Sequence, residues 1–188
     1  MSKAFKNTIA IVTIIILSVS LGYAYDRVIY AIEKRSHPMP EAYKGTIEEY
    51  SRLYNVPQEI IYSVIKAESS FNSNAVSPAG AVGLMQIMPD TYRDIAGRMG
   101  DIANEGLLYD PNTNIKYGTF YLRYLYDMFK EWDLAIAAYN GGLGNVRQWL
   151  RNPEYIKDNE IVYIPIEETR NYLQRVNRNI EVYKRLYF

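Results

Sequence analysis

The chain of 188 residues contains no cysteine and a single histidine, His37. The lack of cysteine excludes disulfide bonds, zinc–thiolate sites and thiol nucleophiles. His37 lies in a proline-containing segment without regular apolar spacing, so histidine-dependent nucleophilic mechanisms and multi-histidine metal sites are also excluded. Chemistry must come from carboxylates, hydroxyls, amides or lysine amines, and we expect neither a cofactor nor a metal.

An excess of charge is also missing, because 21 basic residues balance 21 acidic ones. Nucleic-acid-binding surfaces need a basic excess, so we expect no nucleic-acid partner. Tyrosine, in contrast, is abundant, with 19 residues. Its amphipathic ring suits sugar-binding grooves, although we expect most of these rings to lie in the core or at its rim.

The N-terminal segment predicts a membrane anchor over residues 1–25. No charged residue occurs from Asn7 to Tyr25, and a helix of that length spans about 28 Å, close to a bilayer core. Lys3 and Lys6 precede it, so it also resembles a secretory signal, but the apolar stretch is longer than a typical signal core. We therefore predict a single-pass protein of the cell membrane, with its folded domain outside the cytoplasm.

The rest of the chain predicts a mainly α domain over residues 46–188. Residues 26–45 are expected to form a short helical extension and then a tether that contains Pro38 and Pro40. One strand is expected at residues 161–164. Apolar spacing and turn residues predict helices at 46–54, 57–68, 89–96, 132–139, 145–150 and 167–186, and a long helix that follows residues 110–112 and includes the apolar positions from Ile115 to Phe129.

Glu68 is the candidate general acid. Ile61, Val64, Ile65 and Glu68 share one face of the predicted helix 57–68. A carboxyl on an apolar face is costly to ionise, so its pKa should rise until it can donate a proton near neutral pH. The alternative is a solvated glutamate, or one paired with Lys66.

Four motifs in this order resemble the soluble lytic transglycosylase catalytic domain, a lysozyme-like family (glycoside hydrolase family 23). The resemblance covers the chain from about Thr46 to its C-terminus. The motifs are AESSF at 67–71, GAVGLMQIMP at 80–89, AAYNGG at 137–142 and IPIEETRNY at 164–172.

The resemblance implies cleavage of the bond between N-acetylmuramic acid (MurNAc) and N-acetylglucosamine (GlcNAc) in peptidoglycan glycan strands. No water is used: the muramoyl 6-hydroxyl closes on the anomeric carbon and leaves a 1,6-anhydro end. Glu68 corresponds to the single catalytic acid, which then serves as base. The substrate-binding positions implied are Ser69, Met85, Gln86, Tyr139, Asn140, Glu168 and Tyr172.

The chemistry is consistent with one carboxylate. Ordinary glycosidases need two, but a nucleophile held within the substrate removes the need for the second. One alternative is a lysozyme-type hydrolase, for which Glu168 would be the second carboxylate. Another is a non-catalytic peptidoglycan-binding or assembly protein. Single residues also have structural alternatives: Met85 as core filler, Asn140 as a helix cap, and Glu168 in an ion pair with Arg170 or Arg175. A partner in a cell-wall or secretion machinery cannot be named from the sequence.

Overall fold

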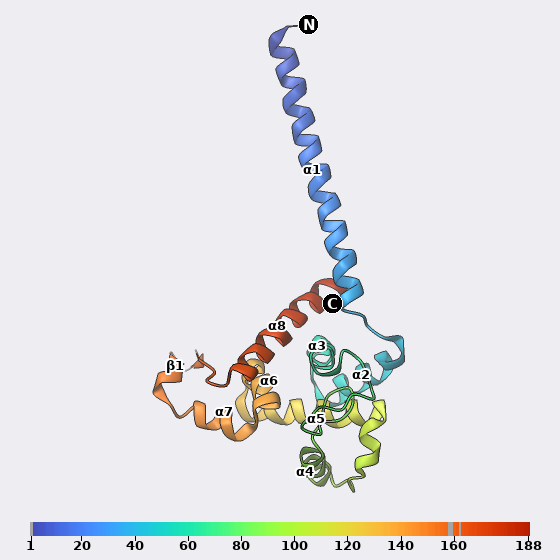
Figure 1. The fold of residues 1–188 in the computed structure, drawn as a ribbon, viewed down its shortest axis with the longest axis vertical. Helices are drawn as coiled ribbons and strands as arrows, with labels where there is room; N and C mark the ends of the chain where they lie inside the picture. Colours follow the sequence, from blue (N-terminus) through green and yellow to red (C-terminus); the bar gives the residue numbers. More distant parts are fainter. Residues whose placement is uncertain (1, 158–159, 162) are drawn as a thin grey trace. The chain divides into compact units, whose positions relative to one another are not determined.

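The computed structural model describes residues 2–157, 160–161 and 163–188. The chain forms two compact units, Met1–Pro38 and Met39–Phe188 (Figure 1). The first unit is the single helix α1, Lys3–Ser36, whose first turn is capped by the Ser2 side chain. Within the described residues, α1 is the one helix long and apolar enough to cross a membrane, with a mean hydropathy of 2.0.

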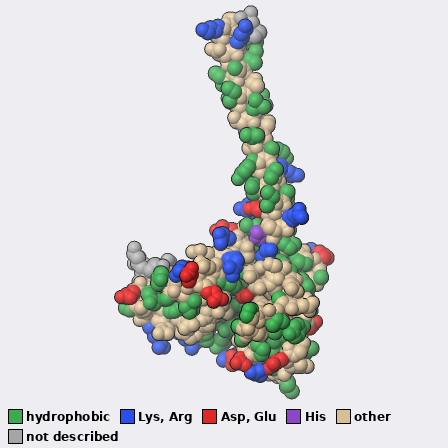
Figure 2. Space-filling model, viewed as in Figure 1, with side chains coloured by type: hydrophobic (Ala, Val, Ile, Leu, Met, Phe, Trp, Pro, Cys, Tyr) green, Lys and Arg blue, Asp and Glu red, His purple; other side chains and the backbone are tan. Residues whose placement is uncertain are grey.

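Helix α1 continues past Tyr25 without a break, and the segment around Pro38 and Pro40 follows it. Figure 2 shows hydrophobic side chains along this helix and basic side chains at its N-terminal end. Lys34 and Arg35 lie in its last turn. An apolar helix with basic residues at both ends has the form of a membrane-spanning segment.

The second unit is mainly α, which confirms the predicted fold class. Two helices differ most from the predicted limits, since α2 begins five residues early and α4 ends three residues late, at Met99; the limits of the others differ by at most two residues. The helices are α2 (Glu41–Tyr54), α3 (Gln58–Ser69), α4 (Pro89–Met99), α5 (Pro111–Phe129), α6 (Trp132–Gly141), α7 (Leu143–Trp149) and α8 (Glu167–Tyr187), with 3-10 turns at Glu105–Tyr109 and Pro153–Tyr155.

The predicted strand at 161–164 is only partly formed. Strand β2 (Glu160–Ile161) pairs antiparallel with β1 (Ile156–Lys157). Val162 lies outside the described residues. Ile164 is buried, and its carbonyl accepts a hydrogen bond of 2.7 Å from Arg170 Nη1. This segment therefore leads into α8 rather than extending the hairpin.

The core surrounds α3. The apolar face predicted for this helix is confirmed, since Ile61, Val64 and Ile65 are fully buried. Helix α8 packs along α3 and α6, while α5 packs against α2 and α6 (Figure 1). Tyr172, Val176 and Tyr183 are the buried residues of α8 in the core cluster that contains α3. This packing brings the C-terminal end of α3 beside α8.

Candidate active site

Glu68 lies in the last turn of α3, immediately before a strained turn. Ser70 and Phe71 both have positive φ angles, of 50° and 67°. Such angles are uncommon for residues other than glycine, above all for a bulky side chain, and they turn the chain sharply away from the helix. Glu68 is therefore presented at a helix end rather than along a helix side.

The carboxyl of Glu68 is half-buried, and this burial raises its pKa to about 7. The Tyr172 hydroxyl and the positive charge of Arg175 lower the pKa, but by less, and the charge of Glu168 raises it slightly. A carboxyl with a pKa near 7 has both its protonated and its ionised form available at neutral pH. It can therefore give up a proton and take one back.

Helix α8 supplies Glu168, Tyr172 and Arg175, which are four and three residues apart and so share one edge of the helix. Tyr172 is buried, and its hydroxyl has no regular hydrogen-bond partner among the described residues. It faces Glu68 and stabilises the ionised carboxylate. Glu168 and Arg175 are exposed. The described residues contain no ion pair of Glu168 with either Arg170 or Arg175.

Two hydroxyls tie the loop 82–88 to the helices around Glu68. Ser69 Oγ donates to the Leu84 carbonyl at 2.7 Å. Tyr139 Oη, near the end of α6, donates to the Met85 carbonyl at 2.8 Å. The charge of Glu68 raises the pKa of Tyr139, which places that phenol beside the carboxyl, although burial is the larger cause.

Gln86 bends this loop with a φ of 49°. Its Nε2 donates to the Gly83 carbonyl at 2.9 Å and to the Ala75 carbonyl at 3.1 Å. Both amide protons are thus used inside the loop. The side-chain oxygen remains available as an acceptor, which suits an N–H or O–H group of a sugar.

Asn114, on the buried face of α5, holds the same loop and was not identified from the sequence. Its Nδ2 donates to the carbonyls of Val82 and Leu108 at 2.9 and 2.8 Å, and its Oδ1 accepts from Met85 N at 2.7 Å. Gly83, with a φ of +81°, lies so close that a Cβ there would be 2.2 Å from Asn114 Nδ2. The signal for this role in the sequence was that Asn114 is a polar residue next to Ile115, on the apolar face of a predicted helix.

A cavity of about 250 Å³ lies beside these groups. It brings together Gln86, Tyr139 and Asn140, three of the predicted substrate-binding residues. Its other lining residues, which the sequence reasoning did not select, are Ile87, Met88, Thr91, Tyr121, Gly141 and Gly142.

Met85 does not line this cavity. Its side chain is fully buried and packs so closely on Gly118 that a Cβ there would be 2.4 Å from its sulfur. The Met85 side chain is therefore not available to a sugar in this structure, and the partly exposed Met88 faces the cavity instead. Asn140 accepts a hydrogen bond of 2.9 Å from Thr169 Oγ1, which links α6 to α8.

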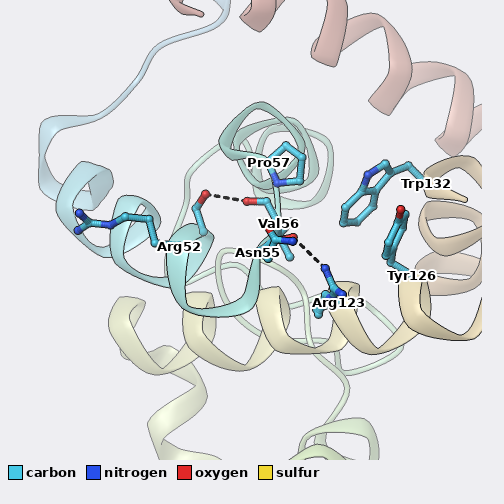
Figure 3. A pocket seen from close by; sticks show the side chains of 8 residues that line it. Arg52, Asn55, Val56, Pro57, Arg123, Tyr126 and Trp132 are labelled. Carbon is cyan, nitrogen blue, oxygen red and sulfur yellow. Dashed lines mark hydrogen bonds between the residues drawn. The ribbon is translucent and has the colours of Figure 1, made fainter. Parts of the chain in front are cut away.

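A second pocket, of about 340 Å³, lies at the opposite end of α3, around Pro57 (Figure 3). Figure 3 shows Trp132 and Tyr126 together on one wall, with the rings stacked at 4.3 Å, and Arg123 nearby. No carboxylate lines this pocket. At about 1.5 Å per residue, α3 separates Pro57 from Glu68 by about 16 Å. The second pocket is therefore distinct from the site around Glu68.

Comparison with known proteins places these observations in a family. Residues 45–162 match the family model described as Transglycosylase SLT domain. The chain is 39% identical over 143 residues to the soluble lytic murein transglycosylase of Escherichia coli (strain K12), covering 73% of this chain and 22% of that protein. It is 34% identical over 180 residues to the membrane-bound lytic murein transglycosylase C of Salmonella arizonae, covering 82% of this chain and 48% of that protein.

Solved structures agree. The 70 kDa soluble lytic transglycosylase of Escherichia coli matches with a TM-score of 0.74 and 33% identity, over 81% of this chain and 25% of that one. An inactive mutant of the Pseudomonas aeruginosa lytic transglycosylase Slt matches with a TM-score of 0.70 and 34% identity, over 78% of this chain and 25% of that one. The chain thus spans less than half the length of these relatives, and it belongs to the Transglycosylase SLT domain family.

Proposed function

We propose that this chain is a peptidoglycan lytic transglycosylase, a carbon–oxygen lyase that cleaves the MurNAc–GlcNAc bond without water. The observation that carries the proposal is the half-buried Glu68, whose pKa is about 7, beside Tyr139 and Tyr172. The family supports it, because the relatives named above are lytic murein transglycosylases.

In the proposed reaction Glu68 acts first as an acid. Its proton passes to the glycosidic oxygen, the bond from that oxygen to the muramoyl anomeric carbon breaks, and positive charge develops on the sugar. The Glu68 carboxylate then takes the proton of the muramoyl 6-hydroxyl while that oxygen bonds to the anomeric carbon. The product carries a 1,6-anhydro ring, and Glu68 is protonated again for the next cycle.

The surroundings of Glu68 favour a single carboxylate. Among the residues that the structure describes, Glu168 is the one acid whose charge is found to act on Glu68, and its effect is the smallest of those that shift the Glu68 pKa. Glu168 is also exposed on α8. A buried second carboxylate that could activate water is therefore not part of the described site, and Glu168 remains the residue through which a hydrolase would have to act.

We assign substrate contacts to the residues that line the cavity, chiefly Gln86, Tyr139 and Asn140, with Met88 in place of Met85. Ser69 holds the loop 82–88 to the end of α3 beside Glu68, and Tyr172 faces Glu68 from α8. The amide of Gln86 offers an acceptor for acetamido or hydroxyl groups.

The decisive experiment compares the chain with Glu68→Gln on purified sacculi. We expect Glu68→Gln to lower turnover by about 10²–10⁴-fold, because the acid is lost while the shape is kept. A solved Pseudomonas aeruginosa relative described as inactive carries one such glutamate-to-glutamine change. Glu167→Gln, an exposed neighbour on α8, is the matched control and should remain active.

Mass spectrometry of the released fragments tests the chemistry. Anhydro-muramoyl ends support the proposal, whereas reducing ends, together with loss of activity in Glu168→Gln, would support a hydrolase. Retained activity in Glu68→Gln would overturn the choice of acid. Binding of sacculi without any release of fragments by the unmodified chain would support a non-catalytic peptidoglycan-binding protein.

We further propose that α1 anchors the chain as a single span, with the folded domain outside the cytoplasm. The apolar length of α1 and the membrane-bound Salmonella arizonae relative support this. The anchor is assigned to residues 1–25 and the catalytic domain to residues 46–188. Because α1 runs to Ser36 and α2 begins at Glu41, the non-helical part of the tether is reduced to residues 37–40.

A further inference from the structure

Arg175 is a cation beside Glu68 that the proposed reaction does not use. Its guanidinium carbon lies 5.6 Å from the centre of the Tyr172 ring, and the hydroxyl of that ring faces Glu68. Arg175 is exposed and makes no ion pair or hydrogen bond within the part of the chain that the structure describes. Its positive charge is nevertheless felt at Glu68.

The other arginine of this helix end has a structural role. Arg170 donates to the Ile164 carbonyl at 2.7 Å and stacks over the Tyr163 ring at 5.5 Å, so it fixes the entry into α8. The one contact that the structure gives for Arg175 among the described residues is that of its guanidinium carbon with the Tyr172 ring, and this contact uses none of the guanidinium N–H donors in a hydrogen bond. Its N–H donors are therefore open to an anion at the edge of the site.

The substrate class carries such an anion. The muramoyl residue bears a lactyl arm on C3, close to the anomeric carbon at which the reaction occurs. When the stem peptide has been removed, this arm ends in a carboxylate. When the peptide is present, the arm continues as an amide into a peptide with its own carboxylates. A guanidinium binds carboxylates through two parallel hydrogen bonds.

We propose that Arg175 is a specificity-determining residue that binds a carboxylate on the lactyl–peptide arm of the muramoyl residue beside the scissile bond. The proposal rests on the proposed function. The carboxylate comes either from the lactyl group of a peptide-free strand or from the stem peptide, and the two sources are separable by experiment.

The test uses the full chain in detergent with three substrates: peptide-bearing strands, peptide-free strands, and peptide-free strands whose carboxylates are converted to amides. We expect Arg175→Gln to lose about tenfold in kcat/KM on one of the two carboxylate-bearing substrates, mainly through KM, and nothing on the amide form. Arg175→Lys should recover part of the loss, because it keeps the charge but not the paired donors. The control is Arg178→Gln, which removes an exposed cation one turn further along α8. It should leave kcat/KM unchanged on both carboxylate-bearing substrates.

If Arg175→Gln loses kcat/KM on peptide-free strands, Arg175 binds the lactyl carboxylate. If it loses kcat/KM on peptide-bearing strands, Arg175 binds a carboxylate of the stem peptide. An equal loss on all three substrates, or no loss on any, would overturn the proposal, because Arg175 would then act on Glu68, on folding or on nothing. If the unmodified chain cleaves none of the strands, the proposed function fails separately. Binding of Glu68→Gln to the carboxylate and amide strands, with and without Arg175→Gln, then decides the role of Arg175 by itself.

Discussion

At the scale of single residues, the raised pKa of Glu68 connects the site to the stability of the domain. Burial raises this pKa from an ordinary value of 4.5 to about 7. The folded protein therefore holds a proton that the unfolded chain has released between these pH values, so stability falls as pH rises from about 4.5 to 7. Above pH 7 Glu68 is ionised in the folded protein, and the unfavourable burial of its charge then lowers the free energy of unfolding by its full amount.

Glu68→Gln removes that penalty. We compare the free energies of unfolding of this variant and of the unmodified chain. We expect the difference, variant minus unmodified, to be larger at pH 8 than at pH 4 by about 2–3 kcal/mol. Thermal unfolding in mild detergent, followed by circular dichroism at several pH values, measures the difference. A stability difference that does not change with pH would show that Glu68 ionises normally.

Tyr172→Phe should raise the Glu68 pKa further, because the hydroxyl that stabilises the carboxylate is removed. The alkaline limb of kcat/KM against pH, which follows loss of the acid form, should move to higher pH. Stability should change by less than about 1 kcal/mol, since this hydroxyl has no regular hydrogen bond to lose. The control is Tyr62→Phe, which also removes a buried hydroxyl with no hydrogen-bond partner among the described residues. An equal shift of the alkaline limb in both variants would contradict the prediction.

At the scale of elements, the loop 82–88 depends on Asn114. Asn114→Ala removes the partner of the Met85 N–H and of the Leu108 carbonyl, and it takes one of two hydrogen bonds from the Val82 carbonyl, which still accepts from Ile87 N. We therefore expect a loss of about 3–5 kcal/mol in the free energy of unfolding. Asn145→Ala removes one exposed bond to the Gly141 carbonyl and should cost at most about 1 kcal/mol. Denaturant titration of both variants gives the comparison, and equal costs would mean that Asn114 does not hold the loop.

Helices were more predictable than this loop, for a physical reason. The spacing of Ile61, Val64 and Ile65 is a local signal for a buried helix face, and it correctly predicted α3. The loop instead depends on Asn114, which is distant in sequence, and on positive φ angles at residues such as Gln86. Neither leaves a periodic pattern.

The lack of a periodic pattern in this loop also explains why the sequence did not show which methionine of the GLMQIMP motif faces the cavity. Met85 and Met88 have equal chemistry, and only the turn between them decides which one is buried. That turn closes through paired hydrogen bonds of 3.0 Å between Val82 and Ile87. For Tyr139 and Asn140, by contrast, a position near the end of a small-residue helix before Gly141 was visible in the sequence, and both line the cavity.

At the scale of the whole molecule, α1 should decide in which cell fraction the chain is found. We expect the full chain to sediment with membranes and to resist washing at alkaline pH, because its apolar length matches a bilayer core. A variant that lacks residues 2–36 should appear in the soluble fraction and should keep the helices of the second unit, α2 to α8. Fractionation and immunoblotting test this, and a shortened soluble product from the full chain would show that α1 is a cleaved signal.

The hydrogen bond from Tyr139 to the Met85 carbonyl limits what this phenol can do in the reaction. Its one proton is already directed at the carbonyl, at 2.8 Å. Toward the cavity it therefore presents only lone pairs. It can receive a hydrogen bond from protonated Glu68 or from a sugar hydroxyl, but it cannot supply a proton to a departing oxygen unless the loop opens. Tyr139 is thereby excluded as a substitute acid.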